Sequence, residues 1–360
     1  MNETKRYIMK SSDIINQRLR NQGLVNSIWK SPQEVVKALG AIQSQDYKGA
    51  KWAIGLRLPN STDIDIEKAM TDGKIIRTHV LRPTWHFVAP EDIRWMLKLT
   101  APRVKKTLAS YYHKLNLNES TLQKAQQVLQ KSMKGKQLIR SELRAALEKE
   151  GINIKDLRFG FILAHAELDG LICSAGRRGK QHTYVLLDER VPITKAVTPK
   201  NPLLELVTRY FTTHGPATVQ DFTWWAWVKT ADVKKALQDS NLKSAEIDGK
   251  TYWFSHIHVE KQRESMHLLP NYDEYISYKD RSHYFEQAIS KNSLINHFII
   301  QNGKMIGAWK HPAGKDVKMS LFKSLSSSEN QALSYQLKRY IDFRGQVINF
   351  TTSSVPEVHL

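Results

Sequence analysis

Two glutamines, Gln43 and Gln45, are separated by a single residue in the stretch G-A-I-Q-S-Q-D-Y at residues 40–47. A glutamine carbonyl accepts a hydrogen bond from water, and its amide can donate one to a phosphate or sugar oxygen. Two such side chains that converge could hold a water molecule next to a nucleic acid. The competing interpretation is that both amides only satisfy backbone groups at the end of a helix.

Convergence of the two glutamines depends on the local backbone. The apolar residues from Val35 to Ile42 repeat at helical spacing after the start signal Ser31-Pro32. If that helix continued, Gln43 and Gln45 would point in nearly opposite directions, whereas alternate side chains of an extended segment share a face. We therefore predict that the helix ends near Ile42 and that residues 43–45 are extended.

The charge of the chain points to an anionic partner. There are 54 Lys and Arg against 35 Asp and Glu, which gives a formal net charge of +19. Such an excess favours binding to phosphate backbones through counterion release, although net charge also serves solubility alone. Basic residues surround the predicted hairpin tip S-A-G-R-R-G-K, and we expect phosphate or minor-groove contacts there, unless the tip is simply solvated. The predicted DNA-binding residues are Arg82, Arg177, Arg178, Lys180 and His182.

Several other classes of protein are disfavoured. No apolar run approaches the roughly 20 residues of a spanning helix, and the N-terminal residues lack the apolar centre of a signal peptide, so a cytoplasmic protein is expected. The single cysteine, Cys173, excludes an internal disulfide and a cysteine-rich metal site. Nucleotide-binding glycine loops and serine-hydrolase elbows are absent. We predict no metal and no cofactor, and we interpret the acidic residues Asp273, Glu274 and Asp280 as ion-pair partners of Lys279 and Arg281 or as braces of a domain junction.

The predicted elements follow a repeated order of helices and then a hairpin. This order indicates an α+β chain of three tandem winged helix-turn-helix modules, followed by strands that we interpret as a small β-barrel-like domain. The predicted boundaries are residues 1–97 for the first module with the glutamines, 98–136 for a basic helical connector, 137–200 for the second module with its basic wing, 201–265 for the third module, and 266–360 for the β-rich domain. No heptad repeat or separate dimerisation module is found, so a monomer is expected.

Four stretches of the chain resemble the AlkZ-type alkylpurine DNA glycosylases. They are the Gln-x-Gln motif at 43–45, R-T-H-V-L-R-P-T-W-H-F-V-A-P-E-D-I-R-W at 77–95, G-P-A-T-V-Q-D-F-T-W-W at 215–225 and L-L-P-N-Y-D-E-Y-I-S-Y-K-D-R at 268–281. The resemblance implies a concave DNA-binding surface and a monofunctional enzyme that hydrolyses the N-glycosidic bond of N7-alkylated purines. Some members of the family also unhook interstrand crosslinks. Ser44 departs from the apolar residue that is usual between the glutamines, which leaves the substrate open.

That chemistry assigns roles to the neighbours of the glutamines. A cationic N7-alkylguanine is a good leaving group, so the enzyme needs to position water more than to supply a strong base. Asp46 can stabilise the positive sugar or cap the helix that follows, and we favour the cap. Trp85 and His86 can approach the same site and contact the lesion, although a tryptophan is more often part of the core. The rival function is a non-catalytic winged-helix DNA-binding protein, and an enzyme acting on RNA or a free nucleoside also remains open.

Overall fold

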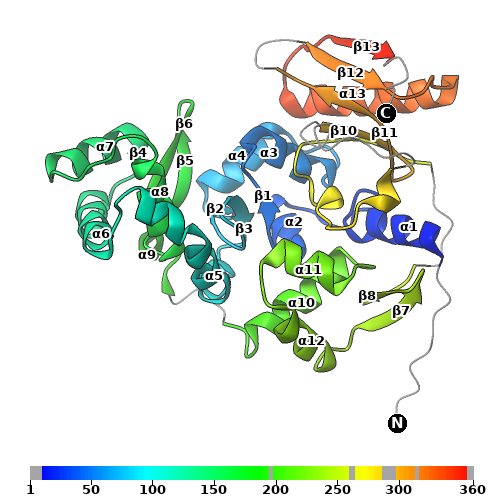
Figure 1. The fold of residues 1–360 in the computed structure, drawn as a ribbon. Coiled ribbons are helices and arrows are strands. Elements are labelled where there is room, and N and C mark those ends of the chain that lie inside the picture. The colour runs from blue at the N-terminus through cyan, green and yellow to red at the C-terminus, as the bar shows by residue number, and fades with distance from the viewer. Residues whose placement is uncertain (1–9, 194–197, 259–263, 286–296, 313–315, 355–360) are drawn as a thin grey trace.

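The computed structural model describes residues 10–193, 198–258, 264–285, 297–312 and 316–354. The N-terminal residues in which no signal peptide is predicted therefore lie largely outside the described part. The architecture is mixed α+β, with the N-terminal part at the centre, flanked by three other groups of elements (Figure 1). In the described residues, none of the helices has both the length and the apolarity needed to cross a membrane.

The central part contains the glutamines on a very short strand between helices. Helix α2 begins at Pro32, as predicted, but the Ser31 hydroxyl donates to the Glu34 carboxylate at 2.9 Å and does not cap a backbone N–H. The elements of this part are α1 (Ser11–Asn21), α2 (Pro32–Leu39), β1 (Ile42–Gln43), α3 (Tyr47–Leu56), α4 (Asp63–Thr71), β2 (Ile76–His79) and β3 (Trp85–Val88).

The next part is helical and then forms a long hairpin. The connector is helical, as predicted, but its predicted boundary at 97/98 falls within helix α5. Arg177 and Arg178 belong to strand β5 and not to the hairpin tip, because the strands extend further than predicted. The elements are α5 (Ile93–Lys114), α6 (Glu119–Met133), β4 (Leu138–Ile139), α7 (Arg140–Lys149), α8 (Arg158–Leu168), β5 (Ile172–Arg178), β6 (Gln181–Leu186) and α9 (Leu187–Arg190).

A single six-stranded sheet joins these two parts. Its strand order is β1-β3-β2-β5-β6-β4, and Arg77 on β2 pairs with Ser174 on β5. The hairpin that we predicted as the wing of a second module therefore continues the sheet that carries the glutamines. This pairing fixes the position of the wing relative to β1 through the strands between them.

The third part packs three helices and a separate two-stranded sheet beneath the centre (Figure 1). The hairpin turns at Asp248-Gly249, and Trp225 is fully buried. Trp224 and Trp227 are half-buried. The elements are α10 (Pro202–Thr213), α11 (Val219–Ala226), α12 (Thr230–Gln238), β7 (Lys243–Ile247) and β8 (Lys250–Phe254).

The C-terminal part is an open sheet covered by a helix, so the predicted barrel-like closure is not observed. Its strand order is β13-β12-β11-β10-β9, and within the described residues no pairing joins β13 to β9. The elements are β9 (Met266–Leu269), the 3₁₀ turns η2 (Glu274–Ile276) and η3 (Ser282–Tyr284), β10 (His297–Gln301), β11 (Lys304–Lys310), β12 (Val317–Leu321), α13 (Ser327–Arg344) and β13 (Phe350–Ser354).

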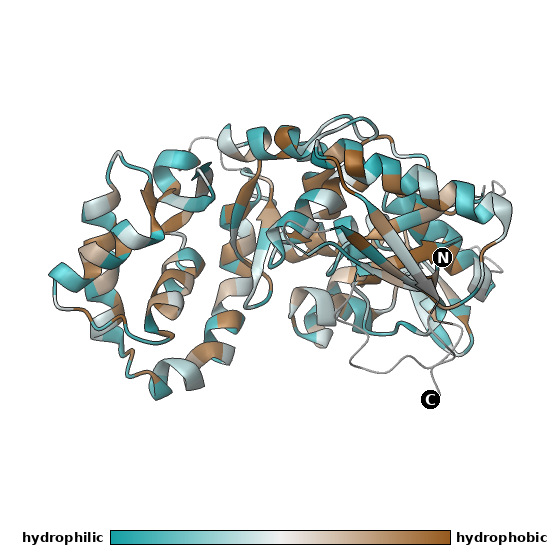
Figure 2. Cartoon of the chain, turned by 90° about the horizontal axis from the view of Figure 1, so that it is seen from above, coloured by the Kyte–Doolittle hydropathy of each residue, from teal (hydrophilic) through white to brown (hydrophobic). Residues whose placement is uncertain are grey.

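Apolar burial links the central, third and C-terminal parts. One large cluster of buried apolar residues draws from all three, whereas a second cluster holds the helices from α5 to α8 together. Figure 2 shows the apolar segments gathered in the interior and the hydrophilic ones on the outer faces. At the junction, Arg57 binds Asp273 through two bonds of 2.9 Å, and both side chains are fully buried. Breaking such a pair by removing one partner typically costs about 3–5 kcal/mol, so these parts are strongly coupled.

Candidate active site

The helix that precedes the glutamines ends before them, as predicted. Helix α2 stops at Leu39, and Gly40 follows with a φ of 81°, a conformation that glycine adopts without steric cost. Gln43 then pairs with His86 of β3, and the Ser44 N–H donates to the Trp85 carbonyl at 2.7 Å. The segment is extended through Ser44 and bends at Gln45 and Asp46.

Gln43 thus belongs to β1 and lies on the same face as His86, whereas Gln45 lies in the bend that follows the strand. Gln45 is exposed, and its Oε1 accepts a hydrogen bond of 3.0 Å from the hydroxyl of Thr84, the residue just before strand β3. Gln43 is half-buried, and among the described residues no side chain or backbone group bonds its carboxamide. An amide without a protein partner is free to bind water or a ligand.

Ser44 and Trp85 belong to the opposite face, since side chains alternate along the strands. The Ser44 side chain is fully buried, and its hydroxyl lacks a partner in the described structure. Trp85 is half-buried and packs under the Arg77 guanidinium, 4.4 Å from the ring centre. Arg77 also donates two bonds to the Ser44 carbonyl, at 3.0 and 3.3 Å. The structure thus separates Trp85 from the glutamine face, and Arg77 is a contact that the sequence analysis missed.

His86 lies on the glutamine face and is fully buried. Its Nδ1 is 3.0 Å from the Thr84 carbonyl, whereas its Nε2 is buried without a partner in the described structure. Burial, with the nearby positive charge of Arg82, lowers the pKa of His86 well below its ordinary value. His86 is therefore a neutral imidazole at physiological pH. His86 pairs with Gln43 across the strands, so two polar groups without partners in the described structure lie on this face.

Asp46 caps helix α3, which agrees with the interpretation that we favoured. Its Oδ1 accepts from the Gly49 N–H at 3.1 Å, and its Oδ2 lies 4.0 Å from the His297 ring. The residue is half-buried, so part of the carboxylate stays accessible to solvent. The main contact of the Asp46 carboxylate is thus with the N-terminus of α3.

Arg82 lies in the tight turn between β2 and β3. The turn is unusual because Leu81 has a φ of 64°, which side chains rarely adopt. The Arg82 guanidinium packs on Trp224 of α11 at 5.1 Å, and two of its nitrogens are buried without partners in the described structure. Burial lowers the pKa of the group. Arg82 is only 8% exposed, which limits its reach toward a phosphate unless the ligand enters the turn.

Glu274 holds the glutamine strand from a distance of 231 positions along the chain. Its carboxylate accepts the Gln43 N–H at 3.0 Å and the Trp225 indole N–H at 2.8 Å, and it lies 3.3 Å from the His214 ring. Burial alone would raise the pKa of Glu274, but the contact with His214 and the charge of Arg82 lower it. The acidic residues thus brace a junction as expected, although with partners other than Lys279 and Arg281. The acidic motif in the sequence was the signal that could have linked Glu274 to the site.

The basic wing residues are largely engaged within the protein. Arg178 binds the Glu142 carboxylate and the Gln137 carbonyl, both at 2.7 Å, and Arg177 binds the Lys180 carbonyl at 2.9 Å. His182 packs edge-on against Tyr47, and burial beside Arg77 and Arg177 lowers the pKa of His182 to about 4. Lys180 is exposed, and its ammonium has no partner within the described part of the chain. Among these residues, Lys180 is the best placed for an external phosphate.

Metal ligation receives no support from the described residues. They contain no group of three His, Cys, Asp or Glu side chains that could hold an ion. Cys173 is buried, and burial raises the pKa of its thiol to about 12, so it is inert as a nucleophile at neutral pH.

Comparison with known proteins identifies the class. The sequence profile of the family described as DNA glycosylase AlkZ-like matches residues 36–343, which cover the glutamine strand and all four parts of the fold. The family match over most of the chain thus places it in the DNA glycosylase class. The chain belongs to the AlkZ-like DNA glycosylase family, and the resemblance seen in the sequence is confirmed.

Two relatives illustrate the similarity. The interstrand DNA cross-link repair glycosylase of Streptomyces sahachiroi is 21% identical over 317 residues, which cover 81% of this chain and 85% of that protein. The solved structure of the Streptomyces sahachiroi DNA glycosylase AlkZ superposes with a TM-score of 0.78 at 18% identity, over 97% of this chain and 100% of that one. At this identity the structural likeness shows a shared fold.

Proposed function

We propose that this chain is a monofunctional DNA glycosylase that hydrolyses the N-glycosidic bond of cationic N7-alkylated purines in duplex DNA. Bulky N7 adducts and interstrand crosslinks are further candidate substrates, because a relative is named for crosslink repair. Membership of the AlkZ-like family supports the reaction class. The preferred adduct is to be decided by measuring base release from duplexes that carry different N7 lesions.

The observation that carries the proposal is the unpartnered Gln43 carboxamide, which shares a strand face with neutral His86 and lies two residues before Gln45, whose carbonyl contacts Thr84. In the proposed reaction, the Gln43 or Gln45 carbonyl accepts a hydrogen bond from the attacking water. The water oxygen bonds to C1′ of the sugar, and the C1′–N9 bond breaks with its electrons passing to the cationic base. The base leaves neutral, the water loses a proton to solvent, and an abasic sugar remains.

Neutral amides suit this reaction better than they would suit an ordinary hydrolysis. The positive charge of the alkylated base already weakens the bond, so a water held in line needs little deprotonation before attack. We assign Asp46 to the cap and a secondary electrostatic role, and His86 to water or sugar contact. Trp85 contributes from the opposite face, by supporting the strands. No cofactor is required by this chemistry.

The proposed binding mode uses the whole chain as a monomer on duplex DNA, in the cytoplasm. Three winged helix-turn-helix modules, a helical connector and the C-terminal sheet domain would provide it, with the boundaries expected from the sequence except that the connector begins with helix α5 at Ile93. Lys180 leads the proposed backbone contacts, with Arg177, Arg178 and His182 adjacent to it and Arg82 nearer the lesion. Positive charge of the whole chain supports this mode.

The test is release of N7-methylguanine from a duplex, detected as alkali-labile abasic sites under single-turnover conditions. Wild type is expected to release the base, and Gln43→Ala and Gln45→Ala are expected to lose release while retaining DNA binding. A duplex with a bulkier N7 adduct or a crosslink extends the substrate range. If wild type binds DNA tightly yet releases none of these bases, the non-catalytic DNA-binding function replaces this proposal.

A further inference from the structure

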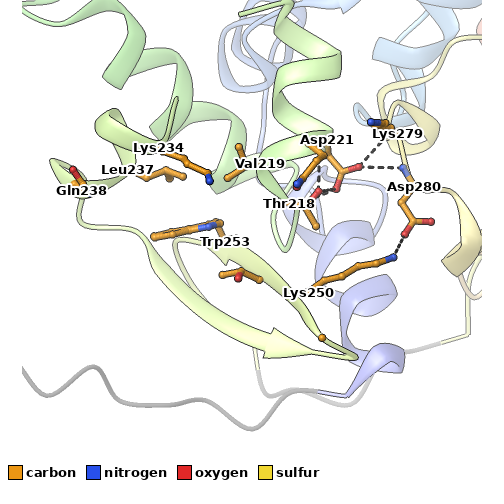
Figure 3. Close-up of a pocket in the computed structure, with 13 residues that line it drawn as sticks. Thr218, Val219, Asp221, Lys234, Leu237, Gln238, Lys250, Trp253, Lys279 and Asp280 are labelled. Carbon is orange, nitrogen blue, oxygen red and sulfur yellow. Dashed lines mark hydrogen bonds and ion pairs between the residues drawn. The ribbon is translucent and has the colours of Figure 1, made fainter. Parts of the chain in front are cut away.

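A second site lies in the third part of the fold, apart from the glutamine strand. A pocket of about 970 Å³ opens between helices α11 and α12, the β7–β8 hairpin and the segment at 279–280 (Figure 3). Lys234 and Trp253 lie on one side of it, and Lys250, Lys279 and Asp280 lie on the other. None of the residues at the glutamine face lines this pocket.

Three lysines line the pocket, and two of them have no ion-pair partner among the described residues. Lys234 and Lys279 are exposed, and their ammonium groups have no partner within the described residues. Lys250 is paired with Asp280 at 2.5 Å, so it is a weaker candidate for a ligand. Two unpartnered lysines that line one cavity favour an anion with more than one oxygen, because each ammonium contributes separate donors.

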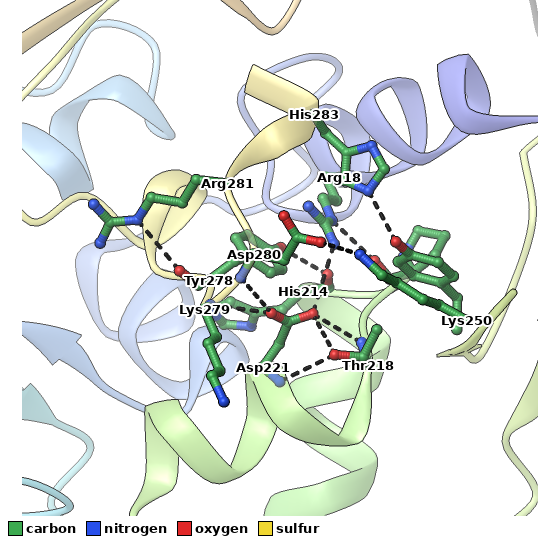
Figure 4. Close-up of polar contacts among 12 residues, drawn as sticks. Arg18, His214, Thr218, Asp221, Lys250, Tyr278, Lys279, Asp280, Arg281 and His283 are labelled. Atoms are coloured by element: carbon green, nitrogen blue, oxygen red, sulfur yellow. Dashed lines mark hydrogen bonds and ion pairs between the residues drawn. The ribbon is translucent and has the colours of Figure 1, made fainter. Parts of the chain in front are cut away.

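The second acidic residue of the pocket does not oppose an anion strongly. Asp221 is almost fully buried and accepts from the Thr218 N–H and hydroxyl at 2.9 and 2.8 Å. It also accepts from the backbone N–H groups of Lys279 and Asp280 at 3.0 and 3.2 Å, and Arg18 lies 4.0 Å away (Figure 4). Its charge is thus compensated inside the protein. These bonds also fix the backbone that carries Lys279 at the mouth of the pocket.

Trp253 provides an aromatic surface beside these charges. The residue is partly exposed, and within the described chain its indole N–H has no hydrogen-bond partner. Its backbone is held rigidly, because it pairs with Ser244 on β7 and with Ala217 before α11. An indole face next to lysine ammonium groups is the combination that nucleic-acid-binding proteins use for a stacked base and its phosphate.

We propose that this pocket binds a nucleotide unit, with the base against Trp253, the phosphate near Lys234, and Lys279 at the mouth of the pocket. The unit comes either from a free nucleoside monophosphate or from a single strand of DNA. The site is distinct from the hydrolytic one, and its occupancy does not depend on base release. The third part of the fold would then bind an unpaired nucleotide.

Isothermal titration calorimetry on the full chain at low salt tests the proposal. The probes are deoxyadenosine monophosphate, deoxyadenosine, inorganic phosphate and a short single-stranded oligodeoxynucleotide. Lys234→Ala combined with Lys279→Ala is expected to weaken nucleotide binding by about tenfold or more, and Trp253→Leu by a similar factor. Lys235→Ala is the matched control, since Lys235 is an exposed neighbour on the same helix that does not line the pocket.

The binding results distinguish a free nucleotide from a strand of DNA, and they also show whether the proposal fails. Binding of both the mononucleotide and the oligonucleotide with this variant dependence assigns a free-nucleotide site, and binding of the oligonucleotide alone assigns a strand of DNA. Phosphate that binds as tightly as the nucleotide would overturn the role of the ring. The proposal also fails if the pocket variants bind every probe as well as Lys235→Ala does. Because the lysines are exposed, their variants remain informative should Trp253→Leu fold poorly, and base release is measured separately.

Discussion

The glutamine face and the basic wing belong to the same six-stranded sheet, yet they differ in whether their polar groups have hydrogen-bond partners. On the glutamine face, the Gln43 amide and one nitrogen of His86 have no partner among the described residues. On the wing, Arg178 is held by two bonds and Arg177 by a backbone carbonyl. The half-buried Gln43 amide is open to a substrate, whereas engaged arginines must first break internal bonds. Residue type alone therefore does not show which of these polar groups are free to bind.

The largest expected effect is on the reaction. Gln43→Ala should lower single-turnover base release by between about 100-fold and 10,000-fold, because it removes a group that positions the water. Stability should change little, since the side chain has no partner among the described residues. Gln130→Ala, an exposed glutamine on α6, is the control. Unchanged release in Gln43→Ala would show that the free amide is incidental.

The stability of the fold around strand β1 should depend on Glu274, which accepts the Gln43 N–H. Glu274→Ala removes the acceptor of the Gln43 N–H, of the Trp225 indole and of a contact with His214, and we expect a loss of about 3 kcal/mol in the free energy of unfolding. Glu274→Gln keeps an acceptor oxygen and should lose less. Urea denaturation followed by circular dichroism measures both. Equal stability of Glu274→Ala and wild type would contradict the assigned role.

Both regions should lose stability in acid through a histidine with a lowered pKa. His86 and His182 are both held neutral in the folded state, the pKa of His182 at about 4 and that of His86 well below its ordinary value. In the unfolded chain both titrate near about 6.5, so the unfolded state binds more protons below that pH and stability falls as pH falls through it. Because both histidines stay neutral in the folded state, His86→Asn and His182→Asn should each flatten the decline in melting temperature between pH 7 and pH 5, and to a similar extent. A variant whose decline equals that of wild type would show that its histidine is protonated in the folded state as well.

The smallest effect is expected on the wing. Lys180→Ala should weaken duplex binding a few-fold and reduce the slope of log K against log salt by about 1, as expected for one lost phosphate contact. Arg178→Ala should change the slope less, because its guanidinium is engaged with Glu142 and Gln137. Binding titrations at several salt concentrations measure both slopes. A larger change for Arg178→Ala would mean that DNA displaces these internal partners.

Features that depend on neighbouring residues could be predicted from the sequence, whereas features that depend on pairing with distant segments were missed. The helix end was predicted near Ile42 and occurs at Leu39, and the predicted extended segment 43–45 is extended only through Ser44. These features were accessible because adjacent residues decide them, and the Asp46 cap needs only Gly49 three positions on. The wing strands were placed too short, because β5 and β6 continue to pair with each other as far as Arg178 and Gln181. The barrel-like domain was expected from a run of strands, but strand propensity does not specify whether the two edges meet.

The sequence by itself determined the positive charge, the break between α2 and β1, and the family to which the chain belongs. Only the tertiary structure decided which neighbours the glutamines have. Thr84 and His86 reach them because β3 pairs with β1, and Glu274 reaches the Gln43 backbone from a distant turn. Trp85 was placed on the other face by the same pairing. The physical reason is that caps and helix stops are short-range, whereas register and burial depend on contacts between segments far apart in the chain.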